Sequence, residues 1–160
     1  MSARNEHVVA IVLEPVAIGQ EFIDWPLHIT IVPWFPRDDA QKLDSILTNV
    51  AKTQSGFSVE VGEIEKFGPE KNVKVNLIKD SSGLNELHWI IFKVLEKNKF
   101  GIHQKEYVGN GYRPHITHQP HGHARLGDSF RVKSFILVKQ VRQKKTGIMI
   151  KAIDKEYSLQ

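Results

Sequence analysis

Apolar residues along the chain follow two different spacings, which indicates a mixture of strands and helices. Alternating or β-branched apolar runs predict strands over residues 7–13, 27–32, 57–64, 72–78, 103–108, 113–118, 130–141 and 148–153. Pro33 and Pro36 are expected to close the second strand, because proline lacks the N–H group that a sheet requires. The last two runs are expected to form a hairpin.

Two segments carry apolar residues at steps of three and four, which predicts amphipathic helices over residues 38–53 and 84–97. Asp38, with Gln41 three residues later, is the expected cap of the first helix, and Ser82 is the expected cap of the second. Two helices among about eight strands predict an α+β fold. No linker or low-complexity segment divides the chain, so residues 1–160 are expected to form a single domain.

Composition narrows the possible chemistry of this domain. The 160 residues include no cysteine, which excludes disulfides, thiolate zinc sites and cysteine nucleophiles. The net charge of +4 favours a polyanionic partner such as RNA or a nucleotide. No apolar stretch approaches the roughly 18 residues of a membrane span, and no signal-peptide pattern is present. We therefore expect a cytoplasmic protein that does not associate with a membrane.

The tripeptide His-Ile-Thr occurs twice, once in each half of the chain. One copy spans residues 28–30 and the other spans residues 115–117. An aromatic residue lies three positions before each histidine, Trp25 in the first half and Tyr112 in the second. Composition alone would give roughly 0.03 copies of this tripeptide, so a matched pair indicates function.

Strand geometry gives the motif a physical meaning. Side chains alternate across a strand, so His28 shares one face with Thr30, and His115 shares one face with Thr117. If the two halves are related by pseudo-twofold symmetry, both pairs converge on one site. One imidazole could then accept a proton while the other donates one near neutral pH. The two hydroxyls could donate hydrogen bonds to phosphate oxygens, so the motif pair predicts catalysis on a phosphodiester that requires no metal.

These motifs, in the contexts LHITIVPWF and YRPHITHQP, resemble those of the 2H phosphoesterase superfamily. The resemblance is greatest to the RNA 2′,3′-cyclic phosphodiesterases, also called 2′–5′ RNA ligases. It implies a bilobal, pseudo-twofold fold in which two antiparallel sheets flank a central cleft and the helices lie outside. It also implies hydrolysis or transfer at cyclic or 2′-linked phosphates without a cofactor or metal. Family precedent favours His115 as the group that activates water and His28 as the group that protonates the leaving oxygen.

The sequence departs from the family pattern at His118, where members usually carry an apolar residue. Strand alternation points His118 away from His115, so we expect it to affect packing and not chemistry. Histidines 115, 118, 121 and 123 could suggest a metal site, but the alternation separates the first two and no carboxylate joins them. A loop that carries His121 and His123 is the simpler interpretation.

Several further residues could bind the substrate. Arg113 shares strand parity with His115 and could clamp a phosphate, and Tyr112 could stack on a base at the mouth of the cleft. Trp25 could stack on a base there as well, and packing is the competing interpretation for both Tyr112 and Trp25. Phe67 could lie near the substrate or in the core. Four basic residues surround the last predicted turn and could contact an RNA backbone or simply face solvent: Lys139, Arg142, Lys144 and Lys145.

The sequence thus predicts a monomeric enzyme that acts on an RNA end or a nucleotide. The catalytic residues would be His28, Thr30, His115 and Thr117, and the substrate-binding residues would be Arg113 and Tyr112. One alternative is a catalytically silent RNA- or nucleotide-binding module with the same cleft. A second alternative is a metal-dependent hydrolase that uses the histidine cluster.

Overall fold

A computed structural model describes residues 6–36 and 39–160. Its strands are β1 (Glu6–Val12), β2 (Glu21–Phe22), β3 (His28–Pro36), β4 (Phe57–Phe67), β5 (Val73–Ile78), β6 (His115–Thr117), β7 (Ser129–Val132), β8 (Ser134–Arg142) and β9 (Met149–Ser158). The helices are α1 (Ala40–Thr53) and α2 (Ser82–Lys97), with two 3₁₀ turns, η1 (Lys105–Tyr107) and η2 (Gly109–Gly111). No helix among these described residues is both long and apolar enough to cross a membrane.

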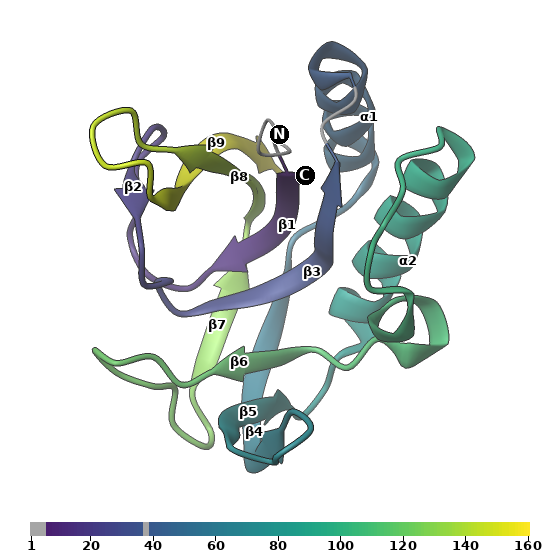
Figure 1. Cartoon of the computed structure of the whole chain (residues 1–160). Helices are drawn as coiled ribbons and strands as arrows, with labels where there is room; N and C mark the ends of the chain where they lie inside the picture. Colours follow the sequence, from purple (N-terminus) through teal and green to yellow (C-terminus); the bar gives the residue numbers. More distant parts are fainter. Residues whose placement is uncertain (1–5, 37–38) are drawn as a thin grey trace.

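The strands form a sheet in the order β2-β9-β8-β1-β3-β6-β5-β4-β7, and each described pairing between strands is antiparallel. The α+β prediction is confirmed. The two sheets that the resemblance implied are joined edge to edge, because the first-half strand β3 pairs with the second-half strand β6. Figure 1 shows β3 and β6 side by side in the middle of the molecule, between the two groups of strands.

The sheet buries different side chains on its two faces. On one face, the apolar stripes of α1 and α2 pack with Ile29 of β3 and Ile116 of β6 in the larger core. Figure 1 shows both helices on the same side of the sheet. On the other face, a smaller cluster covers β1, β8 and β9: Val8, Ala10, Ile136, Val138 and Ile153. Because side chains alternate, His28 and Thr30 point away from the helices, toward the side of this second cluster.

Strand β3 is longer than the sequence predicted, and it continues through Pro33 to Pro36. The register with β1 shifts between the pairs Val9↔Val32 and His7↔Phe35, so three steps along β3 match two steps along β1. Pro33 falls within this bulge. Proline is tolerated there because no ladder hydrogen bond needs its missing N–H group.

The predicted strand over residues 103–108 is wrong. This segment forms η1, whose turn is closed by a bond from Tyr107 N to Gln104 O. Apolar residues in this segment are too sparse to cover a core, since only Val108 is buried between residues 103 and 108. The run 130–141 is also divided, because Lys133 separates β7, which pairs with β4, from β8, which pairs with β1 and β9.

Both helix caps lie one residue from the predicted positions. Asp38 lies outside the described residues, and the cap of α1 is Asp39, whose carboxylate accepts a hydrogen bond from Lys42 N at 3.0 Å. The cap of α2 is Ser81, and the predicted cap Ser82 is the first helical residue. The two-residue strand β2 was not predicted, because two residues show no periodicity.

Candidate functional site

The register between β3 and β6 brings the two His-Ile-Thr motifs together. Ile29 lies opposite Ile116, and both side chains are fully buried in the larger core. In an antiparallel pair the flanking residues then meet, so His28 lies beside Thr117 and Thr30 lies beside His115. All four side chains point to the face opposite the two isoleucines. In an antiparallel pair, residues directly opposite each other have Cβ atoms about 5 Å apart, and diagonal neighbours such as the two histidines are about 7–8 Å apart.

Each histidine ring is held through the same type of hydrogen bond. Nδ1 of His28 lies 2.9 Å from the carbonyl oxygen of Pro26, and Nδ1 of His115 lies 2.8 Å from that of Arg113. A carbonyl oxygen can only accept, so each Nδ1 carries the proton that it donates. Nε2 of each ring is therefore the nitrogen that can exchange a proton with a ligand.

Aromatic side chains fix the planes of the two rings in different ways. Trp25 stacks on His28, with ring centroids 4.0 Å apart and an interplanar angle of 22°. Phe67 meets His115 edge-on, with centroids 4.7 Å apart at 68°. Trp25 thus packs against the catalytic candidate and does not stand free at the mouth of the cleft. Phe67 contacts the ring of His115 and also lines the cleft.

The surroundings disfavour the charged form of both histidines. The pKa of His28 is lowered to about 4, mainly by burial. The bond to Pro26 opposes this shift, and the charges of His115 and Lys151 contribute to it. Burial also lowers the pKa of His115, and the guanidinium of Arg113 adds to this effect while the Arg113 carbonyl opposes it. In the ligand-free protein both rings are neutral at pH 7.

A cleft of about 660 Å³ opens on the His115 side of this cluster. Thr30 and His115 line it together with three cationic side chains and three aromatic ones: Lys66, Lys71, Arg113, Phe67, Tyr107 and Tyr112. The predicted site residue Arg113 reaches the cleft, where its Nη2 donates to Glu65 Oε2 at 2.5 Å. Its guanidinium also lies 5.0 Å from the centroid of the Phe67 ring. Glu65 and Glu106 also line the cleft, so three cationic side chains stand against two carboxylates. The remaining excess of positive charge favours an anionic ligand.

Tyr112 lines the cleft, but its contacts are mainly structural. Its hydroxyl donates to the carbonyl of Thr30 at 2.8 Å, and its ring stacks on His88 with centroids 4.0 Å apart at 7°. Burial raises the pKa of the Tyr112 hydroxyl far above its ordinary value. One ring face is therefore occupied by His88, and the hydroxyl ties the segment before β6 to the backbone of the first motif.

The remaining histidines of the second half have separate partners. His118 points away from His115, as predicted, and its Nε2 lies 2.7 Å from Oδ1 of the buried Asn76. Its ring also stacks on His123 at 4.7 Å. His121 pairs with Glu14 at 2.9 Å. No group of three or more side chains suited to hold a metal occurs within residues 6–36 and 39–160.

Two basic residues at the last hairpin make contacts within the protein. Lys139 pairs with Asp154 at 3.7 Å, and Nη1 of Arg142 donates to the carbonyl of Gly147 at 2.6 Å. Lys144 and Lys145 are exposed in the turn between β8 and β9.

Three residues near the motifs were not predicted from the sequence. Glu14 contacts the backbone before His28, His88 lies buried between the two motifs, and Lys151 of β9 adds positive charge near His28. His88 stands at a core position of the apolar stripe of α2, next to Leu84, Leu87 and Ile91. The position of His88 in this apolar stripe is a sequence signal that could have identified it. Glu14 and Lys151 give no such signal, because their contacts depend on how distant segments pack.

Comparison with known proteins supports the same fold. The family model described as the 2′-5′ RNA ligase superfamily matches residues 6–126. Similar solved structures include one described as a phosphoesterase, which is 16% identical with a TM-score of 0.66 and coverage of 98% of this chain and 99% of that one. Escherichia coli LigT complexed with 3′-AMP is 17% identical with a TM-score of 0.65 and the same coverage. The protein TT0787 of Thermus thermophilus is 16% identical with a TM-score of 0.64, covering 96% and 97% of the two chains.

Curated protein sequences give no significant match. At these identities the solved structures establish the fold, and the family model, which spans most of the chain, establishes the family. With its two His-Ile-Thr motifs side by side on one face of the sheet, the chain belongs to the 2′-5′ RNA ligase superfamily of 2H phosphoesterases.

Proposed function

We propose that this protein is a metal-independent phosphodiesterase that acts on 2′,3′-cyclic phosphate or 2′–5′-linked RNA and nucleotide substrates. The observation that carries the proposal is the β3–β6 register, which places two imidazoles and two hydroxyls on one face of the sheet. The cleft beside them is lined by three cationic side chains and two carboxylates. Membership of the 2′-5′ RNA ligase superfamily supports it. Among the similar structures, Escherichia coli LigT is complexed with 3′-AMP in one and with ATP in another.

The reaction requires two proton transfers. For a cyclic phosphate, a water oxygen bonds to phosphorus while one imidazole takes a proton from that water. The bond from phosphorus to one ribose oxygen breaks as the other imidazole protonates this oxygen, and the product is a phosphomonoester with a free hydroxyl. We assign the base role to His115 and the acid role to His28, following family precedent. Thr30 and Thr117 would donate hydrogen bonds to the non-bridging oxygens as their charge grows.

The acid must carry a proton on Nε2, whereas burial keeps both rings neutral in the free protein at pH 7. A phosphate anion in the cleft favours the imidazolium through its negative charge. We infer that substrate binding raises the pKa of the acid and so prepares the site for turnover. The neutral base needs no such change, because its Nε2 already holds a free lone pair.

The test is hydrolysis of a 2′,3′-cyclic nucleotide in the presence of a chelator, with wild type and the variants His28→Ala and His115→Ala. Wild type is expected to turn over, and each variant is expected to lose about 10²–10⁴-fold in kcat, the usual contribution of a positioned acid or base. His103→Ala is the matched control, because His103 is exposed and pairs with Glu6. A 2′–5′-linked dinucleotide, with product position read by phosphorus NMR, separates the two substrate types.

Each alternative predicts a different result. A silent binding module would bind the nucleotide without turnover in any form. A metal-dependent hydrolase would lose its activity in chelator and regain it with added divalent ions. Near-normal turnover by either alanine variant would remove that histidine from the mechanism.

A further inference from the structure

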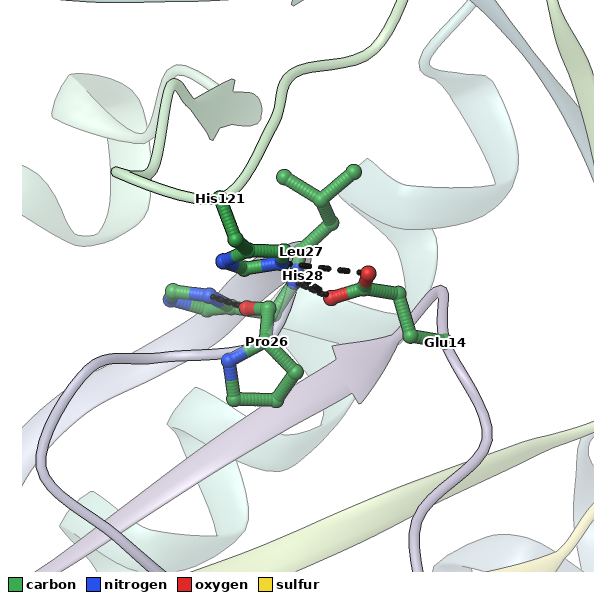
Figure 2. A network of polar contacts seen from close by, with 5 residues as sticks. All are labelled: Glu14, Pro26, Leu27, His28 and His121. Carbon is green, nitrogen blue, oxygen red and sulfur yellow. Dashed lines mark hydrogen bonds and ion pairs between the residues drawn. The ribbon is translucent and has the colours of Figure 1, made fainter.

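A continuous chain of hydrogen bonds leads from His28 to a carboxylate and ends at a second histidine. His28 Nδ1 donates to the carbonyl of Pro26 at 2.9 Å, and Leu27 N donates to Glu14 Oε2 at 2.6 Å. His121 Nε2 lies 2.9 Å and 3.1 Å from the two oxygens of the same carboxylate. Figure 2 shows the carboxylate of Glu14 facing both His121 and the backbone at Leu27.

The central link of this chain is a single peptide group. The carbonyl of Pro26 and the N–H of Leu27 belong to the same peptide bond, which is conjugated. A negative charge at the N–H therefore increases the negative charge on the carbonyl oxygen, because linked hydrogen bonds polarise one another. A stronger acceptor at Pro26 would hold the Nδ1–H of His28 more firmly and stabilise its imidazolium form.

Glu14 is suited to this role because it is ionised. Burial raises the pKa of its carboxyl, but the hydrogen bonds from Leu27 and His121, together with the charge of His121, outweigh burial and leave the pKa below its ordinary value. Glu14 lies in the segment between β1 and β2, and His121 lies in the loop after β6. Their contact thus joins the backbone before the first motif to the loop after the second.

The second motif does not have a corresponding link. His115 Nδ1 donates to the carbonyl of Arg113, but the next residue is Pro114, so this peptide group has no N–H to donate. Each histidine therefore donates from Nδ1 to a backbone carbonyl, but only the peptide group of the Pro26 carbonyl has an N–H that donates to a carboxylate. Of the two motif histidines, only His28 is linked to a carboxylate through the peptide group whose carbonyl accepts from its ring.

We propose that Glu14 is a positioning residue for His28, which it orients and supports as an imidazolium through the Pro26–Leu27 peptide. The catalytic consequence rests on the function proposed above. It matters because other charges near His28 act in the opposite direction. His115 of β6 and Lys151 of β9 both disfavour a positive ring, and Lys151 is held close by a bond from its Nζ to the carbonyl of Ile23 at 3.0 Å. Glu14 is the acidic group that the chain of bonds connects to this ring.

The test uses Glu14→Gln, which keeps an oxygen to accept from Leu27 N and removes the charge. In protein with ¹⁵N-labelled histidine, the Nδ1–H proton resonance of His28 is expected to move upfield as its hydrogen bond weakens. With a 2′,3′-cyclic nucleotide, kcat is expected to fall about tenfold, a typical cost for losing the carboxylate behind a functional histidine, while KM changes by less than about twofold. Glu60→Gln is the matched control, since Glu60 pairs with Lys79 on the exposed surface.

An unchanged His28 resonance in Glu14→Gln overturns the proposal whatever happens to kcat, because Glu14 would then support only the local backbone. In a protein that hydrolyses the cyclic nucleotide, a kcat within about twofold of wild type overturns it as well. If no phosphodiester is turned over, the proposed function fails but the resonance still decides the role of Glu14. The two proposals can therefore fail separately.

Discussion

Replacement of His88 by leucine tests whether this buried ring holds the two motifs together. The His88 side chain is fully buried, and its Nδ1 donates to the carbonyl of Ile31 at 2.7 Å. Its Nε2 accepts from Gly109 N at 2.9 Å, and its ring stacks on Tyr112. Ile31 directly follows the first motif, and Gly109 to Tyr112 lead into the second. One side chain thus connects the backbones of both halves.

The cost of the change can be worked from these contacts. Leucine fills similar space but leaves two buried backbone groups without a partner, at about 1–3 kcal/mol each. The free energy of unfolding should therefore fall by about 2–6 kcal/mol, a large part of the 5–15 kcal/mol typical of a domain. Urea unfolding followed by tryptophan fluorescence measures this difference, because Trp89 lies directly beside His88 in α2.

The difference should also depend on pH. Only neutral His88 can donate from Nδ1 and accept at Nε2, and burial lowers its pKa in the folded protein, against the raising effect of the Ile31 bond. The unfolded chain binds this proton near pH 6.5, so the stabilisation is complete above that value and is lost as the pH falls through it toward the folded pKa. The penalty of His88→Leu should shrink from about pH 7.5 to about pH 5.5. A difference in the free energy of unfolding that does not change with pH, or a variant as stable as wild type, would refute the reasoning. His103→Leu is the control, because His103 is exposed.

Two further variants test other contacts. Asn76→Ala should lower the free energy of unfolding by about 1–3 kcal/mol, because Asn76 is buried and bridges His118 to the carbonyl of Gly62. An unchanged midpoint of urea unfolding would contradict this. Arg113→Ala should raise KM for a phosphodiester about tenfold, because the substrate loses a charged hydrogen bond. The free energy of unfolding should change by less than about 1 kcal/mol, since the pair with Glu65 is exposed. An unchanged KM would show that Arg113 does not bind the substrate.

Much of the site could be predicted because its signal is local. The alternation of side chains along a strand fixes which face His28 shares with Thr30, and no other part of the chain alters that relation. The repetition of the motif in the second half then identified the opposing pair. The helices were predicted for the same reason, since a run such as Leu84, Leu87 and Ile91 reports its buried face directly.

Partners of the predicted strands were harder to predict. The run 130–141 is continuous in the sequence, yet β7 pairs with β4 whereas β8 pairs with β1 and β9. Tyr112 and Trp25 hold the same position relative to their motifs in the sequence, but only Trp25 stacks on a motif histidine. The place beside His115 is taken by Phe67, which belongs to another strand.

The sequence by itself determined that two histidines and two threonines stand in matched strand positions, and that the chain combines two helices with many strands. Only the tertiary structure decided that β3 and β6 are neighbours and which carbonyl accepts a hydrogen bond from each ring. It also decided that Glu14 is linked to His28 and not to His115. The reason is physical. Periodicity along a chain reports which side of an element is buried, whereas register and long-range hydrogen bonds depend on how distant segments pack.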